Sequence, residues 1–159
     1  MTNKMTESVG FPKVILGEII KLLHPDRILL QPRPARMRNR FMVEIEKAFK
    51  EYREEIDAIN KFYAPKDEDG EFIGVKNEDG TVDKSRFNIE QLDQEQAKLF
   101  LNDRQKLDQE DYIFELTDTN KILFDAISDI LDNLDIEFKD SKEQAVYIFL
   151  CNKFKVDEV

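Results

Sequence analysis

Few residues of this chain have the chemistry of a nucleophile, a general base or a soft metal ligand. The sequence has one histidine, His24, and one cysteine, Cys151, in 159 residues. A histidine-based triad needs further partner groups, and a zinc site needs several nitrogen or sulfur ligands. His24 precedes Pro25 and is interpreted as a structural residue at a helix end, and Cys151 lies in the apolar stretch VYIFLCNKF and is interpreted as a core residue. Because the phosphate-binding motifs and the GxSxG motif are also missing, we expect that the protein is not an enzyme.

Carboxylates are abundant, and one group has a spacing that could hold a cation. Asp125, Asp129 and Asp132 recur at i, i+4 and i+7, so they share the polar side of a helix. The chain has 34 acidic residues, so such triples arise easily by chance. A solvated helix face is the favoured interpretation, and we expect no metal site and no cofactor.

An acidic unit, K-x-E-D-G, occurs twice, over 66–70 and 76–80. An EF-hand calcium loop placed on the second glycine would end at Arg86, where that loop needs a glutamate. The units are therefore interpreted as two Asp-Gly turns of a small β-hairpin within 66–87.

The most unusual stretch is RPARMRNRF, over 33–41. The formal net charge is −10, yet five of the eight arginines fall between positions 27 and 40. In one interpretation they neutralise acids elsewhere in the fold, above all those of 125–135. In the other they form a contact patch for an acidic partner surface. The predicted partner-binding residues are Arg33, Arg36, Arg38 and Arg40.

Helical spacing divides these arginines. Arg38 is expected at the edge of the core with its guanidinium emerging, Arg36 is expected to face solvent or a partner, and Arg40 is expected to pair with Glu44 one turn on. A positive cluster at a helix N-terminus opposes the helix dipole, so an acidic group in the fold or in a partner should compensate it.

The composition limits the classes of partner and of location. The chain combines 41% hydrophobic with 36% charged residues, and its pI is near 4.7. A negative field repels phosphate, so neither direct nucleic-acid binding nor membrane binding is expected. Mimicry of nucleic-acid phosphates by the acidic surface stays open as an alternative. Apolar runs are too short to span a membrane, no signal peptide is visible, and one cysteine suits a reducing cytosol, so a soluble intracellular protein is expected.

The strongest structural pattern is an apolar stripe that steps by three or four from Met37 to Tyr63 and predicts a helix from Pro34 to about Tyr63. Helices are also predicted over 11–24, from Asn88 with Gln91 as a capping box, over 122–134, and from Ser141 onward. A short strand is predicted from Tyr112 to Leu116.

Together these elements predict a mainly α fold. We expect a long antiparallel helical hairpin with a small β-hairpin at its tip, a C-terminal helical pair and short strands. Residues 1–33 are predicted to form an N-terminal helix and a Pro-rich connector, and residues 34–159 a single helical domain with 66–87 inserted.

The stretch RMRNRFMVEIEKAFKEYREEIDAINKFYAPKDEDGEFI resembles a domain-of-unknown-function family of small proteins from tailed phages and prophages of Gram-positive bacteria. The R-M-R-x-R-F entry to a long helix, the D-x-D-G turn pair, a helix rich in Glu and Gln, and ILDNLDIEFKDSKEQAVYIFLCNKF carry the resemblance over about residues 34–154. The resemblance implies action in the cytoplasm of an infected bacterium or in the virion, with no known cofactor.

Two functions are expected from these observations. The first is a non-enzymatic phage protein that binds a phage structural or host protein, as an accessory or in virion or tail assembly. The alternative is an inhibitor of a host antiviral defence system, whose acidic surface covers a nucleic-acid-binding groove. Self-association is left open.

Overall fold

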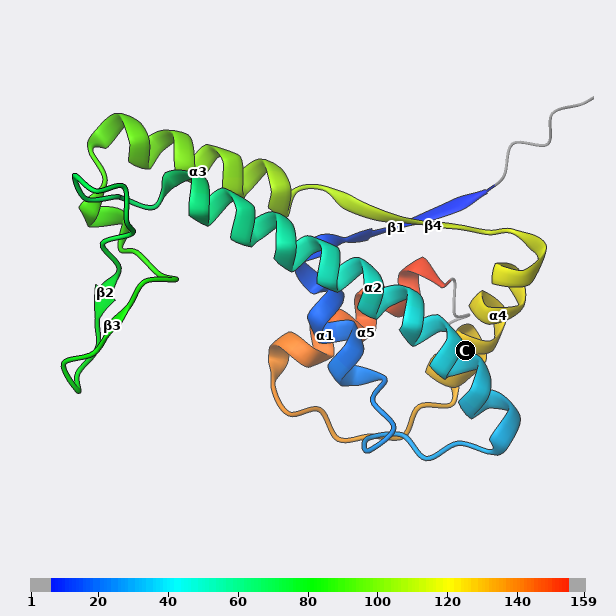
Figure 1. Ribbon diagram of the computed structural model, residues 1–159. Coiled ribbons are helices and arrows are strands. Elements are labelled where there is room, and N and C mark those ends of the chain that lie inside the picture. The colour runs from blue at the N-terminus through cyan, green and yellow to red at the C-terminus, as the bar shows by residue number, and fades with distance from the viewer. Residues whose placement is uncertain (1–6, 155–159) are drawn as a thin grey trace, which may run out of the picture. The chain divides into compact units, whose positions relative to one another are not determined.

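The computed structural model describes residues 7–154 (Figure 1). Two compact units make up the chain, one of residues up to 49 together with those from 111 onward, the other of residues 50–110. The predicted mainly α class is confirmed, and two antiparallel sheets of two strands accompany the helices. Along the chain the elements are β1 (Ser8–Pro12), the 3-10 helix η1 (Lys13–Ile15), α1 (Leu16–Leu22), α2 (Pro32–Tyr63), β2 (Val75–Lys76), β3 (Val82–Asp83), the 3-10 helix η2 (Ile89–Gln91), α3 (Gln94–Asp108), β4 (Asp111–Glu115), α4 (Asp118–Asp132) and α5 (Ser141–Lys153).

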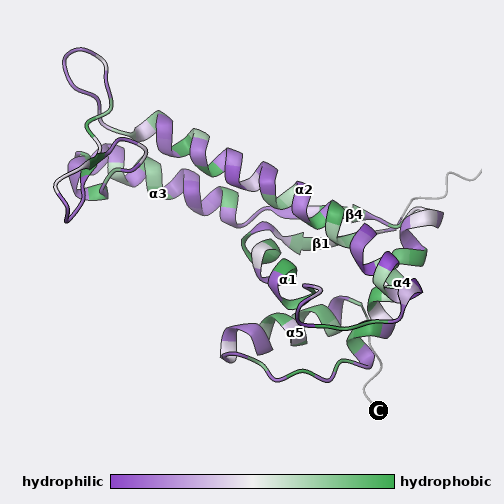
Figure 2. Cartoon of the chain, turned by 60° about the horizontal axis from the view of Figure 1, so that its bottom comes forward, coloured by the Kyte–Doolittle hydropathy of each residue, from purple (hydrophilic) through white to green (hydrophobic). Residues whose placement is uncertain are grey.

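An aromatic cluster forms the centre of the first unit. Phe11 and Phe114 come from the paired strands β1 and β4, Phe41 from α2, and Phe154 follows α5. The ring centroids of Phe41 and Phe114 are 5.5 Å apart, and those of Phe11 and Phe154 are 5.9 Å apart. In Figure 2 hydrophobic residues are plentiful in α1, α4 and α5, the helices that supply the aliphatic side chains around this cluster.

The helix predicted over 11–24 is wrong in its first part. Phe11 and Pro12 belong to β1, which pairs with β4 in the register Phe11 to Tyr112, and the α-helix begins only at Leu16. The short strand predicted from Tyr112 is confirmed as β4. Its partner was missed because the pairing joins segments about one hundred residues apart, and no local periodicity signals such a pairing.

The division into units does not follow the boundary predicted between residues 33 and 34. Residues from 1–33, such as Phe11 and Leu16, share one buried cluster with Phe41 and Leu150. Within the predicted segments, residues 1–6 and 155–159 lie outside the described part of the chain.

The long helix α2 carries the predicted stripe, with Phe41, Ile45 and Tyr52 buried. It begins at Pro32, two residues before the predicted start. Both Pro32 and Pro34 lie in the first turn, where a backbone N–H has no partner inside the helix, so neither ring interrupts a hydrogen bond.

In the second unit, two tyrosines of α2 are bonded to α3. Tyr52 Oη donates a hydrogen bond to Asp108 at 2.6 Å, and Tyr63 Oη donates one to Asp103 at 2.5 Å. In Figure 2 this part of the chain is coloured mostly as hydrophilic. Polar contacts between side chains therefore join α2 and α3 here, beside the edge-to-face contact of the Tyr63 and Phe100 rings.

The small hairpin predicted within 66–87 is confirmed as β2 paired with β3, with strands shorter than expected. Gly70 and Gly80, the glycines of the two repeated acidic units, both have positive φ, which glycine adopts without strain. A single bridge between Lys66 and Phe72 spans the first turn, so each acidic unit reverses the chain once.

The start of α3 is displaced from its predicted position, and α5 begins at Ser141 with a different cap. Gln91 does accept a hydrogen bond from the Asn88 backbone N–H, but this closes the 3-10 turn η2, and α3 begins later with Asp93 as its cap. Ser141 is the first residue of α5, and the preceding Asp140 is the cap. In both cases an aspartate next to the helix start accepts from a free N–H.

Candidate functional site

Arg27, the first of the five clustered arginines, binds inside the fold. Its Nη1 and Nη2 donate to the two carboxylate oxygens of Glu143 at 2.7 and 2.6 Å, and Nη2 also donates to the backbone oxygen of Glu137 at 3.1 Å. These hydrogen bonds lower the pKa of Glu143 to about 2, against the opposing effect of its burial. Arg27 therefore neutralises an acid of α5, and the acids of 125–135, which the sequence favoured, are not its partners.

Arg38 is also internal, so the prediction that its guanidinium emerges as part of a contact patch is wrong. Only 4% of the residue is exposed, and Nη1 donates to the backbone oxygen of Ile28 at 2.6 Å. Desolvation lowers the pKa of Arg38 from its ordinary value. The connector before α2 places this carbonyl over the side chain, a contact that helical spacing alone cannot indicate.

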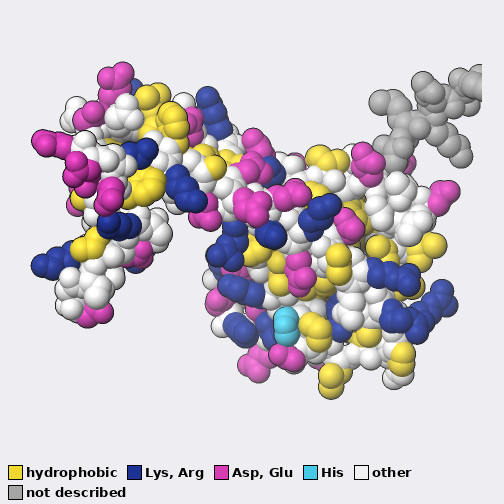
Figure 3. Space-filling view, in the orientation of Figure 1, with side chains coloured by type: hydrophobic (Ala, Val, Ile, Leu, Met, Phe, Trp, Pro, Cys, Tyr) yellow, Lys and Arg dark blue, Asp and Glu magenta, His cyan; other side chains and the backbone are white. Residues whose placement is uncertain are grey.

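The three other arginines, Arg33, Arg36 and Arg40, are exposed. Among residues 7–154 no ion pair involves any of them, and the predicted bond between Arg40 and Glu44 is not formed. Figure 3 shows Lys and Arg side chains gathered over the region where α2 begins. These side chains are available to a partner, and the charge of Arg33, in the first turn of α2, adds to the positive end of the helix dipole.

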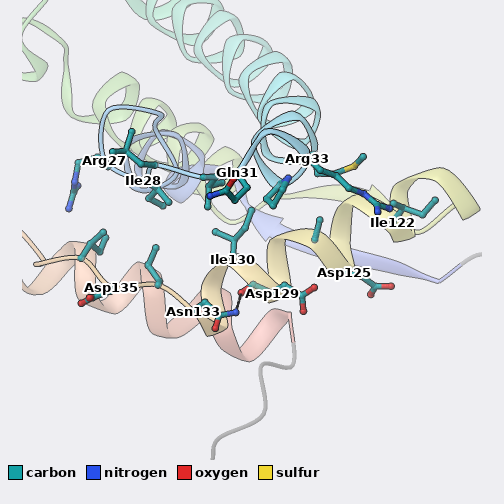
Figure 4. Close-up of a pocket in the computed structure, with 17 residues that line it drawn as sticks. Arg27, Ile28, Gln31, Arg33, Ile122, Asp125, Asp129, Ile130, Asn133 and Asp135 are labelled. Carbon is teal, nitrogen blue, oxygen red and sulfur yellow. Dashed lines mark hydrogen bonds between the residues drawn. The ribbon is translucent and has the colours of Figure 1, made fainter.

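A groove of about 1000 Å³ lies beside this arginine cluster, in the first unit. One wall is the segment 27–37, and the other is α4 with the residues that follow it to Ile136 (Figure 4). The lining is mostly aliphatic and includes Ile28, Leu30, Met37, Ala126, Ile130 and Leu134. The hydrogen bonds of Arg27 and Arg38 join the connector that forms the first wall to α5 and to α2.

Two large aliphatic side chains of the lining are in water. Leu29 is 95% exposed and Ile122 is 56% exposed, one on each wall. Covering such a side chain removes apolar surface from water, which lowers the free energy by about 25 cal/mol per Å². The apolar ILL run in the Pro-rich connector was the sequence signal for this feature, and it was missed.

Opposite charges line the two walls. Arg33 lies on the first wall and the aspartates Asp125, Asp129 and Asp135 lie on the second (Figure 4). No ion pair within residues 7–154 involves these four side chains. Asp125 and Asp129, considered from the sequence as a solvated helix face, thus belong to the groove.

The other residues considered for chemistry have structural surroundings. His24 Nδ1 accepts a hydrogen bond from the Asp26 backbone N–H at 3.1 Å, just after α1. Cys151 is partly buried against the core. In the described part of the chain no group of three or more His, Cys, Asp or Glu side chains is arranged to hold a metal ion.

No helix within residues 7–154 is long and apolar enough to cross a membrane. Comparisons of the chain with known protein families, with characterised proteins and with solved structures found no match.

Proposed function

We propose that this chain is a non-enzymatic protein–protein interaction factor that binds its partner with the groove and with Arg33, Arg36 and Arg40 beside it. The exposure of Leu29 carries the proposal, because the free energy falls when a partner covers an almost fully solvated leucine in an aliphatic groove. The unpaired charges on both walls add specificity, since a partner with the wrong charges would leave them desolvated without compensation.

The resemblance to phage proteins supports a role in an infected bacterium, in the cytoplasm or in the virion, as an accessory or assembly factor. An inhibitor of a host antiviral defence system is the second candidate. The net charge of −10 favours it, because an acidic surface complements the basic groove of a nucleic-acid-binding enzyme.

In this proposal residues 50–110 form the antiparallel helical hairpin that the sequence predicts. The bonds of Tyr52 to Asp108 and of Tyr63 to Asp103 support that arrangement, because residues later in α2 meet residues earlier in α3. The β2–β3 hairpin follows the end of α2 along the chain.

The proposed function is tested by quantitative capture from infected cells followed by mass spectrometry. Leu29 and Ile122, the two exposed aliphatic side chains of the lining, are called the apolar lips of the groove. The double variant Leu29→Glu with Ile122→Glu places a charge on each lip, and it is called the lip variant. Val43→Glu is the matched control, because Val43 is 60% exposed on α2 and does not line the groove.

We expect the double variant to lose a protein that the wild type and Val43→Glu retain. Phage structural proteins among the lost partners favour assembly, and a host nuclease or helicase favours inhibition. Circular dichroism melting checks that all three proteins fold. Identical partners for all three would overturn the proposed function of the groove.

A further inference from the structure

We propose that the groove receives one amphipathic α-helix of the partner protein, with acidic side chains along one flank and basic side chains along the other. This inference rests on the proposed function and names the kind of segment that the groove binds. It follows from the size of the groove, its aliphatic lining, its two apolar lips and the opposite charges on its two walls.

The size and the walls favour a helix over an extended peptide. An α-helix with side chains is about 10 Å across and rises 5.4 Å per turn, so a groove of about 1000 Å³ holds about two turns. An extended peptide needs partners for its backbone N–H and C=O groups, which a free strand edge supplies. None of the described strands β1 to β4 lines this groove, and its lining is mostly aliphatic. A helix satisfies its backbone internally and presents only side chains.

The apolar lips define how the helix is held. Leu29 and Ile122 project from opposite walls and are the exposed apolar groups of the lining. Ile130 lies deeper, with 6% exposure. Apolar side chains of the bound helix, repeated at i, i+3 and i+4, would cover the two lips and reach the groove between them.

The charges define the flanks of the helix. Asp125 and Asp129 are one turn apart on α4, so two basic side chains one turn apart on the bound helix can meet them together. Arg33, on the opposite wall, meets an acidic side chain on the other flank. A helix with the two flanks exchanged would place like charges opposite each other on both walls, which selects one orientation.

The test uses a display library of helical peptides of about four turns. Aliphatic and aromatic residues vary along one face, and each flank position is either Glu or Lys. Binders are selected on the full chain and then measured on three proteins: the wild type, the variant Leu29→Glu with Ile122→Glu, and Val43→Glu. A fourth protein combines Arg33→Glu with Asp125→Lys and Asp129→Lys, which reverses the charge of Arg33 and of the two aspartates that the bound helix is proposed to meet.

We expect binders with Glu on one flank and Lys on the other. Their affinity should fall at least about tenfold on the lip variant and stay unchanged on Val43→Glu. On the charge-exchanged protein, the peptide with exchanged flanks should bind more tightly than the selected one. Because every substituted side chain is exposed, folding is retained, and melting curves verify it.

Four outcomes would overturn the inference. Three of them are a selection that yields no binders, binders that bind the lip variant as tightly as the wild type, and flanks that show no charge preference. The fourth outcome is a wild type that dimerises through the groove, shown by comparing the sedimentation of the wild type and the lip variant. If partner capture from infected cells depends on the groove while the library fails, the proposed function stands and the helical ligand does not. If capture is independent of the groove, the proposed function fails by itself.

Discussion

In the first unit the buried side chains, apart from Arg38 and Glu143, are aromatic and aliphatic groups, whereas in the second unit two of the buried side chains are tyrosines whose hydroxyls bind aspartates. Phe41 and Phe114 are at most 1% exposed and meet edge to face, while Tyr52 and Tyr63 each direct one polar atom to α3. Apolar contact depends mainly on volume and shape, so a core tolerates apolar side chains of similar volume best. A hydrogen bond depends on a single atom, so the second unit should be sensitive to changes that leave its shape intact.

The largest effect is expected from Phe41→Ala in the first unit. Phe41 is fully buried among three other aromatic rings, and such a truncation costs about 3–5 kcal/mol in the free energy of unfolding. Urea unfolding followed by circular dichroism measures it. Val43→Ala, two residues on and 60% exposed, should change the free energy by less than about 0.5 kcal/mol. Equal losses for both variants would contradict an aromatic core at this position.

Replacing Arg27 with Gln tests the polar link of the first unit. The variant leaves Glu143, which is 7% exposed, without its cation, so we expect a clear loss of stability at pH 7. Urea unfolding at several pH values measures the difference from the wild type.

The pH dependence of that difference has a definite sign. The pKa of Glu143 falls from 4.5 to about 2 in the folded protein, so the carboxylate stabilises the fold above the unfolded pKa. As the pH falls from 4.5 toward 2 this contribution is lost, and the two proteins should converge. A difference that stays constant over that range would show that the ion pair does not account for the loss.

In the second unit, Gly74→Ala tests the backbone. Gly74 has a φ of 75°, and an added Cβ would lie 2.6 Å from the backbone oxygen of Asp83. We expect a loss of about 2–3 kcal/mol, seen as faster amide hydrogen exchange in the β2–β3 hairpin. Gly80→Ala is the control, because its φ of 88° carries the same strain but an added Cβ meets nothing within 4 Å. Equal exchange in the two variants would refute the close contact.

The smallest change is Tyr52→Phe, which removes one oxygen. We expect a loss of about 1 kcal/mol and faster hydrogen exchange in α3, with the first unit unchanged. Burial and the bond to Asp108 raise the pKa of Tyr52 to about 12, so its contribution is complete below pH 10 and is lost as the pH rises toward 12. The free energies of unfolding of the wild type and of Tyr52→Phe should therefore converge over that range. The difference between the wild type and Phe41→Ala should stay the same over that range.

Local periodicity was sufficient for α2 and α4 and insufficient for the sheet of the first unit. The stripe on α2 and the apolar face of α4 repeat within a few residues, so they were readable from the sequence. The strand β1 has five residues and finds its partner only at β4. The start of α3 was misplaced because Asn88 and Asp93 are both good caps, and only the folded backbone decides between them.

The candidate site was predictable only in part. Arg36 is exposed, as its angle on the helix predicted. Arg38 is not, because its burial depends on the carbonyl of Ile28 in the preceding connector. The groove joins Leu29 to Ile122, residues far apart in sequence, so no pattern along the chain reveals that they form one surface.

The first unit is assembled from both ends of the described chain, and this has a consequence for the order of folding during synthesis. Phe11 and Phe154 are in contact, so the aromatic core cannot close until almost the whole described chain has left the ribosome. Residues 50–110 are continuous in sequence and can begin to fold earlier. Contacts of such long sequence separation close slowly, so we expect nascent chains that end before α5 to expose Phe41 and Phe114 and to be the species that chaperones bind.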